Sequence, residues 1–199
     1  MRKNPLKIFV LALAISLIQP VAAQNWDINL LSHINPQNPN SGVMIQLTNT
    51  VYPISVASPV ALLATGYLTK NKKIEKDGWE AMGSLLINTV VTEGLKYGFN
   101  RERPYEKYSF IHPYDRTDVG KSFPSGHTST AFATATTLSL EFKKWYVVVP
   151  AYAWATSVGY SRLYLGEHYP TDVFAGAVVG AGSAVLSHWL TRKIFKSKP

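Results

Sequence analysis

Three short stretches of the sequence carry the residues best suited to binding and processing an anion: KYGFNRERP (residues 96–104), PSGH (124–127) and SRLYLGEHYPTD (161–172). Together they supply three cationic side chains that could face one ligand, two histidines and one carboxylate. The common anion that fits such a set is a phosphate or its pentavalent transition state, which needs a nucleophile, charge neutralisation and a proton donor.

The third stretch could supply the nucleophile of this chemistry. His168 and Asp172 are four residues apart, so their side chains can face each other along a helix or across a turn. Asp172 would hold the imidazole in the tautomer whose distal nitrogen is free to attack phosphorus. His127 of the second stretch would protonate the leaving alkoxide and then activate water against the phosphohistidine.

The remaining residues of the three stretches would bind the phosphate. Lys96, Arg103 and Arg162 would neutralise its equatorial oxygens, the arginines in bidentate fashion. Ser125 and Gly126 precede a run typical of a helix, where the serine hydroxyl and the glycine amide would add fixed dipoles. Because three cations supply the electrostatic stabilisation, we expect no metal and no cofactor.

Each stretch also has an ordinary explanation. An Arg-Pro pair is usually part of a loop, and PSGH could be a helix start that happens to contain a histidine. The other histidines, which are His33, His112 and His188, are interpreted as surface or ordinary core residues. The joint occurrence of the three stretches, with this order and spacing, favours the phosphate site.

Composition limits the class of protein. The chain has 199 residues, no cysteine and a formal net charge of +8, which excludes disulfides and thiolate chemistry and suits an anionic partner. Residues 1–23 combine a basic start, a short apolar run and a small-residue ending, as in a signal peptide; a retained first membrane helix is the alternative. Residues 24–42 are polar and rich in turn formers, which predicts an extended segment before a domain over 43–199.

The remaining pattern predicts an all-α helical bundle of about five core helices. We expect these helices over residues 51–68, 79–98, 128–140, 145–166 and 173–191, with a charged connection at 71–78 and a long polar loop at 99–123. Up-and-down helices would gather the lysines of 70–76, 143–144 and 192–198 at one end, as the positive-inside rule predicts for membrane spans. A mean hydropathy of −0.01 leaves a soluble bundle as the alternative.

The three stretches resemble the three-part signature of the type 2 phosphatidic acid phosphatase (PAP2) superfamily, which includes bacterial acid phosphatases, lipid phosphate phosphatases and vanadium haloperoxidases. The resemblance is close from Lys96 to Asp172 and looser in the helix layout from Val43 to Thr191. It implies an all-α core and metal-independent hydrolysis of phosphate esters. It also implies that His168 is the nucleophile and His127 the acid and base.

Residues 1–23 predict an exported protein of the bacterial cell envelope. The resemblance implies that in a membrane member the motifs lie at the outer face of the inner membrane. The expected substrate is a lipid phosphate, with membrane lipid as a partner and no nucleic acid. A soluble periplasmic acid phosphatase acting on small phosphomonoesters is the first alternative. A vanadate-dependent haloperoxidase and a non-catalytic phosphate-binding membrane protein are the others.

Overall fold

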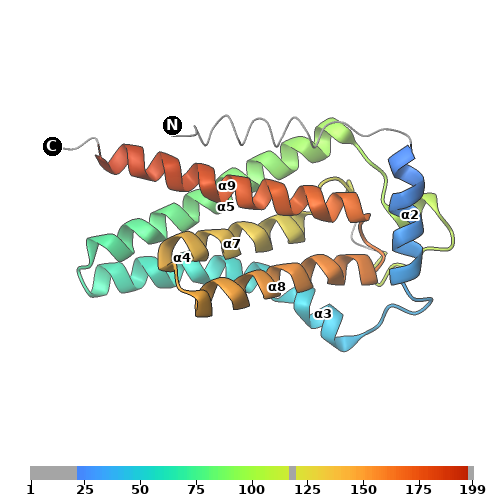
Figure 1. Ribbon diagram of the computed structural model, residues 1–199, viewed down its shortest axis with the longest axis horizontal. Coiled ribbons are helices and arrows are strands. Elements are labelled where there is room, and N and C mark those ends of the chain that lie inside the picture. Colours follow the sequence, from blue (N-terminus) through green and yellow to red (C-terminus); the bar gives the residue numbers. More distant parts are fainter. Residues whose placement is uncertain (1–21, 117–119, 197–199) are drawn as a thin grey trace.

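Five long helices lie side by side in the computed structural model, which describes residues 22–116 and 120–196 (Figure 1). They are α4 (Val51–Leu68), α5 (Lys72–Phe99), α7 (Gly126–Phe142), α8 (Trp145–Tyr164) and α9 (Pro170–Lys196). The predicted all-α bundle is therefore confirmed. The expected signal peptide lies outside the described residues, apart from its last two positions.

Three shorter helices stand near one end of the bundle: α2 (Ala22–Ile34), α3 (Gly42–Asn49) and α6 (Pro104–Lys107). In Figure 1, α2 stands across the end of the bundle rather than along it. The predicted extended segment at 24–42 is wrong over its first part, because residues up to Ile34 are helical. Ile28 and Leu31 lie three residues apart on one helix face and are buried against Ile111, and this tertiary contact outweighs the polar composition.

The charged connection predicted at 71–78 is also helical. Asn71 caps α5, since its side-chain oxygen accepts from the backbone N–H of Lys73 at 3.0 Å and of Ile74 at 3.3 Å. Lys70, in the left-handed region at φ 52°, reverses the chain just before this cap. The turn between α4 and α5 is therefore short, and α5 begins one residue after Asn71.

Small residues let α7 and α9 approach closely at the centre of the bundle. A Cβ atom on Gly180 of α9 would lie 2.0 Å from the carbonyl oxygen of Ser129 in α7, and one on Gly176 would lie 2.7 Å from that of Ser125. Ala131 and Ala135 of α7 are fully buried in the same region. This contact fixes the start of α7 against the start of α9.

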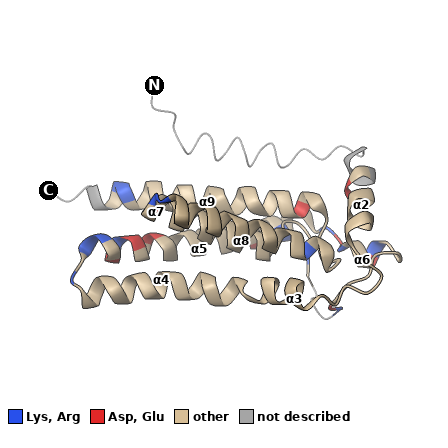
Figure 2. Ribbon diagram, turned by 60° about the horizontal axis from the view of Figure 1, so that its bottom comes forward, with Lys and Arg blue, Asp and Glu red and all other residues tan. Residues whose placement is uncertain are grey.

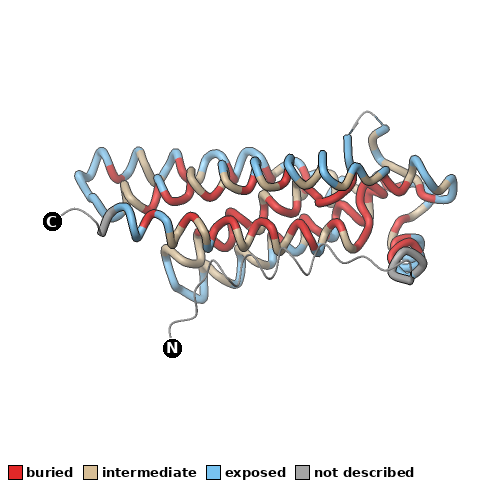
Figure 3. Tube along the Cα trace, turned by 90° about the horizontal axis from the view of Figure 1, so that it is seen from above, coloured by how far each residue is buried: buried red, intermediate tan, exposed pale blue. Residues whose placement is uncertain are grey.

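Part of the outer surface of the bundle is apolar. Two helical stretches of the described chain are long and apolar enough to cross a membrane: Gly42–Leu68, which combines α3 and α4, and Pro170–Ile194 in α9. Only 22% and 39% of their most apolar windows are buried, so most of that surface faces outward. Figure 3 shows the buried residues along the middle of the bundle and exposed ones along its outside.

The two ends of the bundle differ in charge (Figure 2). Lysines of the α4–α5 turn, the α7–α8 turn and the last turns of α9 gather at one end, as the sequence predicts. The end of α5 and the starts of α7 and α9 lie at the opposite end, beside α2 and α6. The three stretches singled out in the sequence therefore share one end.

Candidate active site

His168 and Asp172 of the third stretch form a buried pair. His168 lies in the connection between α8 and α9, and Asp172 lies in the first turn of α9, with 1% and 0% of their surfaces exposed. Nδ1 of His168 lies 3.6 Å from Oδ2 of Asp172. Ser122 donates from Oγ to the same carboxylate oxygen at 2.5 Å and lies 3.5 Å from Nδ1. The carboxylate thus faces Nδ1 of the imidazole.

Ser125 connects the second stretch to the His168–Asp172 pair. Its backbone N–H donates to the carbonyl of Asp172 at 3.0 Å. Its hydroxyl caps α7, accepting from the N–H and the hydroxyl of Thr128 at 3.4 and 2.9 Å. Because Oγ accepts in both contacts, its own proton can still be donated to a ligand.

The end of α5 lies close to the start of α7, where Lys96 approaches Gly126, the residue before His127. The Cε atom of Lys96 lies 3.9 Å from the position that a Cβ on Gly126 would occupy. His127 is half-buried, and its ring packs edge-on against Tyr52 of α4 with centroids 4.9 Å apart. The first two stretches therefore meet at the N-terminus of α7.

Arg103 and Arg162 come from different stretches and share one buried carboxylate. Arg103 precedes α6 and Arg162 lies in the last turn of α8, and only 2% and 4% of their surfaces are exposed. Nη1 of Arg103 donates to Oε2 of Glu167 at 2.8 Å, and Nη2 of Arg162 lies 3.8 Å from the same oxygen. Sequence reasoning missed Glu167, although its position beside His168 placed it inside the third stretch.

Arg101 is a second residue that the sequence analysis missed. Its Nη1 atom donates to Oδ1 of Asp172 at 2.6 Å, and its Nη2 atom donates to Oδ2 of Asp27 in α2 at 2.7 Å. Burial lowers the pKa of Arg101, but Asp172 and Asp27 raise that pKa by more, so it stays above its usual value. The signal for this residue was its place in the arginine-rich loop, two positions before Arg103.

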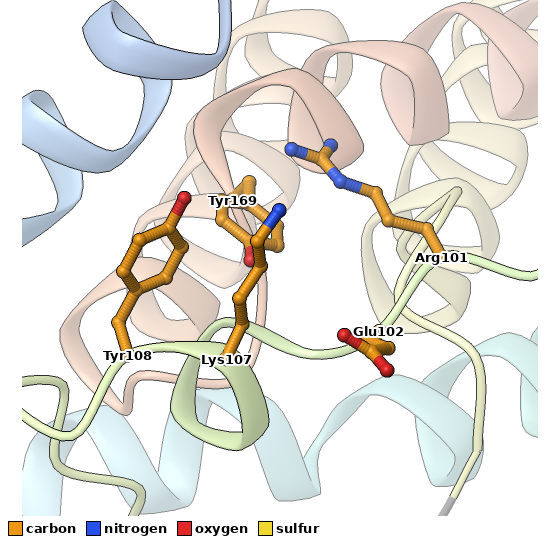
Figure 4. A pocket seen from close by; sticks show the side chains of 5 residues that line it. All are labelled: Arg101, Glu102, Lys107, Tyr108 and Tyr169. Carbon is orange, nitrogen blue, oxygen red and sulfur yellow. The ribbon is translucent and has the colours of Figure 1, made fainter.

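A polar pocket opens beside the Arg101 network, with five lining residues: Arg101, Glu102, Lys107, Tyr108 and Tyr169 (Figure 4). The guanidinium of Arg101 lies 3.7 Å from the centroid of the Tyr169 ring. Burial raises the pKa of the Tyr169 hydroxyl, which keeps it a neutral phenol at physiological pH. The pocket thus offers cationic and phenolic groups next to the candidate site.

The structure brings the predicted site residues of all three stretches to one end of the bundle. Arg103 and Glu167 join the first stretch to the third, the Ser125 amide joins the second to the third, and Lys96 contacts the second. In the described part of the chain, the one group of three histidine and acidic side chains close enough to hold a metal ion lies elsewhere, on α5, α7 and α9. The candidate site itself brings together imidazole, carboxylate and cationic side chains.

Several known proteins resemble this chain. A lipid A 1-phosphatase of Porphyromonas gingivalis is 38% identical over 120 residues, which is 59% of this chain and 24% of that protein. An undecaprenyl-diphosphatase of Sulfolobus acidocaldarius is 32% identical over 62% of this chain and 59% of its own length. The chain thus spans less than two thirds of these relatives.

Solved structures share the fold. The crystal structure of Aquifex aeolicus LpxE matches with a TM-score of 0.66 and 27% identity, covering 82% of this chain and 95% of that one. The transmembrane PAP2-type phosphatidylglycerolphosphate phosphatase of Bacillus subtilis matches with a TM-score of 0.73 and 25% identity over 98% of both chains. Residues 77–196 match the family described as the PAP2 superfamily, and the chain therefore belongs to that superfamily.

Proposed function

We propose that this protein is a metal-independent phosphatase that hydrolyses lipid phosphates through a phosphohistidine intermediate at the outer face of the inner membrane. The observation that carries the proposal is the buried His168–Asp172 pair, with Nδ1 of the imidazole 3.6 Å from the carboxylate. A pure binding site would need the cations but not an imidazole held in this way. Membership of the PAP2 superfamily supports the same chemistry.

The reaction would proceed in two steps at phosphorus. In the first, Nε2 of His168 attacks, the bond between phosphorus and the ester oxygen breaks, and His127 gives its proton to the departing alkoxide. In the second, His127 takes a proton from water, the resulting hydroxide attacks phosphorus, and the phosphorus–nitrogen bond breaks to release phosphate. The carboxylate of Asp172 would stabilise the imidazole at Nδ1 throughout.

The cationic side chains would stabilise the negative charge on the phosphoryl oxygens in the transition state. Arg103 and Arg162 are held by Glu167 on one side, so their guanidinium groups are already oriented before a substrate arrives. Lys96, the Ser125 hydroxyl and the Gly126 amide would complete the oxygen-binding set from the N-terminus of α7.

Lipid substrates fit the outer surface of the bundle. Val56 and Val60 on α4 and Phe174 on α9 are 58%, 52% and 71% exposed, which suits contact with acyl chains. The relatives named above are phosphatases of lipid A and of undecaprenyl diphosphate, and phosphorylated lipids are therefore the substrate class that we propose. The lysine-rich end would face the cytoplasm, which puts His168 at the opposite, outer face.

A substrate panel tests the proposal. Purified protein in detergent is given lipid A, undecaprenyl diphosphate, phosphatidylglycerophosphate and a soluble phosphomonoester, each with and without EDTA. We expect kcat/KM for at least one lipid to exceed that of the soluble ester by about tenfold or more, which corresponds to ~1.4 kcal/mol of transition-state binding, and EDTA to leave it unchanged. Equal or better turnover of the soluble ester would favour the periplasmic acid phosphatase instead.

Membrane orientation can be tested separately because the chain contains no cysteine. Single cysteines at Tyr114, near the site, and at Lys144, in the α7–α8 turn, are both at exposed positions. A membrane-impermeant maleimide added to whole cells with a permeable outer membrane should label Tyr114→Cys and not Lys144→Cys. The reverse pattern would invert the proposed orientation.

A further inference from the structure

A second group of ionisable side chains lies at the lysine-rich end of the bundle, remote from the candidate active site. Glu80 of α5, Glu141 in the last turn of α7 and His188 of α9 meet there. Figure 2 shows the acidic residues of α5 at this end. The group thus joins three helices that are far apart in sequence, and no step of the phosphatase chemistry uses it.

The donor atoms of this group converge. One ligand atom from each of the three side chains lies within 4.8 Å of the other two. Nδ1 of His188 contacts Oε1 of Glu80 directly, and Oε1 of Glu141 is buried without a hydrogen-bond partner among the described residues. The Ser187 hydroxyl donates to the carbonyl of Glu80 at 2.7 Å, which fixes α9 against α5 beside the group.

Burying ionised side chains costs free energy unless their charge is compensated. The side chain of Glu80 is only 3% exposed and that of His188 is 19% exposed. A neighbouring carboxylate, Asp77, bonds Lys73 at 2.6 Å, so a lysine already balances its charge. Buried carboxylates that stay ionised need a compensating positive charge. With both carboxylates ionised and the imidazole neutral, as metal ligands must be, the group would carry a charge of −2, which one divalent cation would neutralise.

We propose that Glu80, Glu141 and His188 form a binding site for a first-row divalent cation, of which Zn²⁺ is the best match. Bonds from zinc to imidazole nitrogen or carboxylate oxygen are about 2.0–2.2 Å long, so in the tetrahedral geometry that zinc prefers two ligand atoms stand about 3.4 Å apart. The three ligand atoms lie within 4.8 Å of one another, so side-chain shifts of about 1 Å would enclose an ion. A mixed nitrogen and oxygen donor set favours Zn²⁺ over Mg²⁺, which prefers oxygen ligands and water.

The ion would tie α5, α7 and α9 together at the end opposite to His168. It would bind the folded protein and not the unfolded chain, and would therefore raise thermal stability without entering the reaction. Under this proposal His188, which the sequence analysis interprets as a surface or ordinary core residue, would be a ligand. This inference is independent of the proposed phosphatase activity, because its measurements are binding and unfolding.

The test uses full-length protein in detergent, with any affinity tag removed and metals stripped by chelation. Titration calorimetry with Zn²⁺ and with Mg²⁺ measures affinity and stoichiometry, and thermal unfolding is followed with and without each ion. We expect one Zn²⁺ per chain and a Tm raised by several degrees. Mg²⁺ should bind at least about tenfold more weakly, as expected for a site with a nitrogen ligand.

Variants identify the ligands. Glu141→Gln keeps the size of the side chain and should weaken Zn²⁺ binding at least about tenfold, as should His188→Asn. Matched controls are Glu75→Gln, which makes the same change near the start of α5, and His33→Asn at an exposed position of α2; both should bind as wild type. The metal-free Tm of each variant reports whether it has folded. Absence of stoichiometric Zn²⁺ binding by the wild type, or undiminished affinity in a folded Glu141→Gln protein, would overturn the proposal and leave a buried histidine–glutamate pair.

Discussion

Arg101 binds the oxygen of Asp172 that faces away from His168. Its Nη1 atom donates to Oδ1 at 2.6 Å, whereas Oδ2 is the oxygen 3.6 Å from the imidazole. Oδ2 also accepts from the Ser122 hydroxyl at 2.5 Å and from the Tyr169 amide at 3.0 Å. Both oxygens of the carboxylate are thus held, and its position relative to the imidazole is fixed.

Replacing Arg101 by Gln should lower kcat while changing KM little, because the side chain positions Asp172 rather than contacting substrate. Losses of about 10- to 100-fold are typical when such an outer partner is removed. Arg101→Lys should restore part of kcat, since one ion pair can still form. Steady-state kinetics on the best lipid substrate measure both constants.

The matched control is Arg116→Gln, which removes an exposed arginine from the same loop and should behave as wild type. Circular dichroism and thermal unfolding confirm that each variant is folded. Unchanged kcat in Arg101→Gln would show that Asp172 holds its position without this contact.

Replacing His168 and replacing His127 should impair different steps of the reaction. His168→Ala should abolish both turnover and the trapping of a phosphorylated protein from labelled substrate, because the nucleophile is gone. His127→Ala should slow hydrolysis of alkyl esters by about 10²–10⁴-fold, the range typical of general acid–base catalysis.

The acid role of His127 can be isolated with a better leaving group. A nitrophenyl phosphate departs without protonation, so His127→Ala should still release nitrophenol in a first burst and accumulate the phosphohistidine. His33→Ala, at an exposed position on α2, is the control for loss of a histidine. A labelled intermediate in His168→Ala would assign the nucleophile to another residue.

The sequence predicted the convergence of the three stretches because each stretch borders a long apolar helix. Antiparallel neighbours of similar length bring alternate connections to the same end, so chain order and spacing were sufficient. The helix at Ala22–Ile34 could not be predicted in this way. Its burial depends on Ile28 and Leu31 packing against residues more than a hundred positions away, such as Leu163.

The side chains that hold the residues of the three stretches in place could not be predicted from the sequence either. Nothing local distinguishes Glu167 from a solvent-exposed loop residue, since its carboxylate becomes buried only when Arg103 and Arg162 meet it. The same holds for Asp27, whose contact with Arg101 needs α2 to cross the end of the bundle. Spacing identifies residues that act on a common ligand, whereas residues that hold them are identified by three-dimensional contacts.

Gly180→Ala should destabilise the protein strongly, because the new Cβ would lie 2.0 Å from the carbonyl oxygen of Ser129 and force α7 and α9 apart. Gly94→Ala on α5 is the matched control, since nothing lies within 4 Å of its Cβ position. There alanine should raise stability by about 0.5–1 kcal/mol through its better helix propensity. Thermal unfolding in detergent measures both changes; a Tm for Gly180→Ala at or above the wild-type value would contradict the close helix contact.

Glu167→Gln should lower stability and tighten the binding of oxyanions. The carboxylate lies 2.8 Å from Nη1 of Arg103 and 3.8 Å from Nη2 of Arg162, and all three residues are buried. Removing its charge leaves two buried guanidinium groups less well compensated, and breaking such a pair costs about 3–5 kcal/mol. A free phosphate or vanadate ion would then replace the missing negative charge.

Thermal unfolding of Glu167→Gln with and without vanadate separates these two effects. Without vanadate we expect a Tm about 6–20 °C below wild type, given about 2–4 °C per kcal/mol for a chain of this size. Saturating vanadate should raise the Tm of the variant by more than it raises that of the wild type, because the ion neutralises arginines that Glu167 otherwise neutralises. Glu106→Gln, which alters a carboxylate bonded to the Arg103 amide rather than to its guanidinium, is the control and should show the wild-type vanadate shift. Equal shifts in Glu167→Gln and wild type would mean that the two arginines are not the oxyanion clamp.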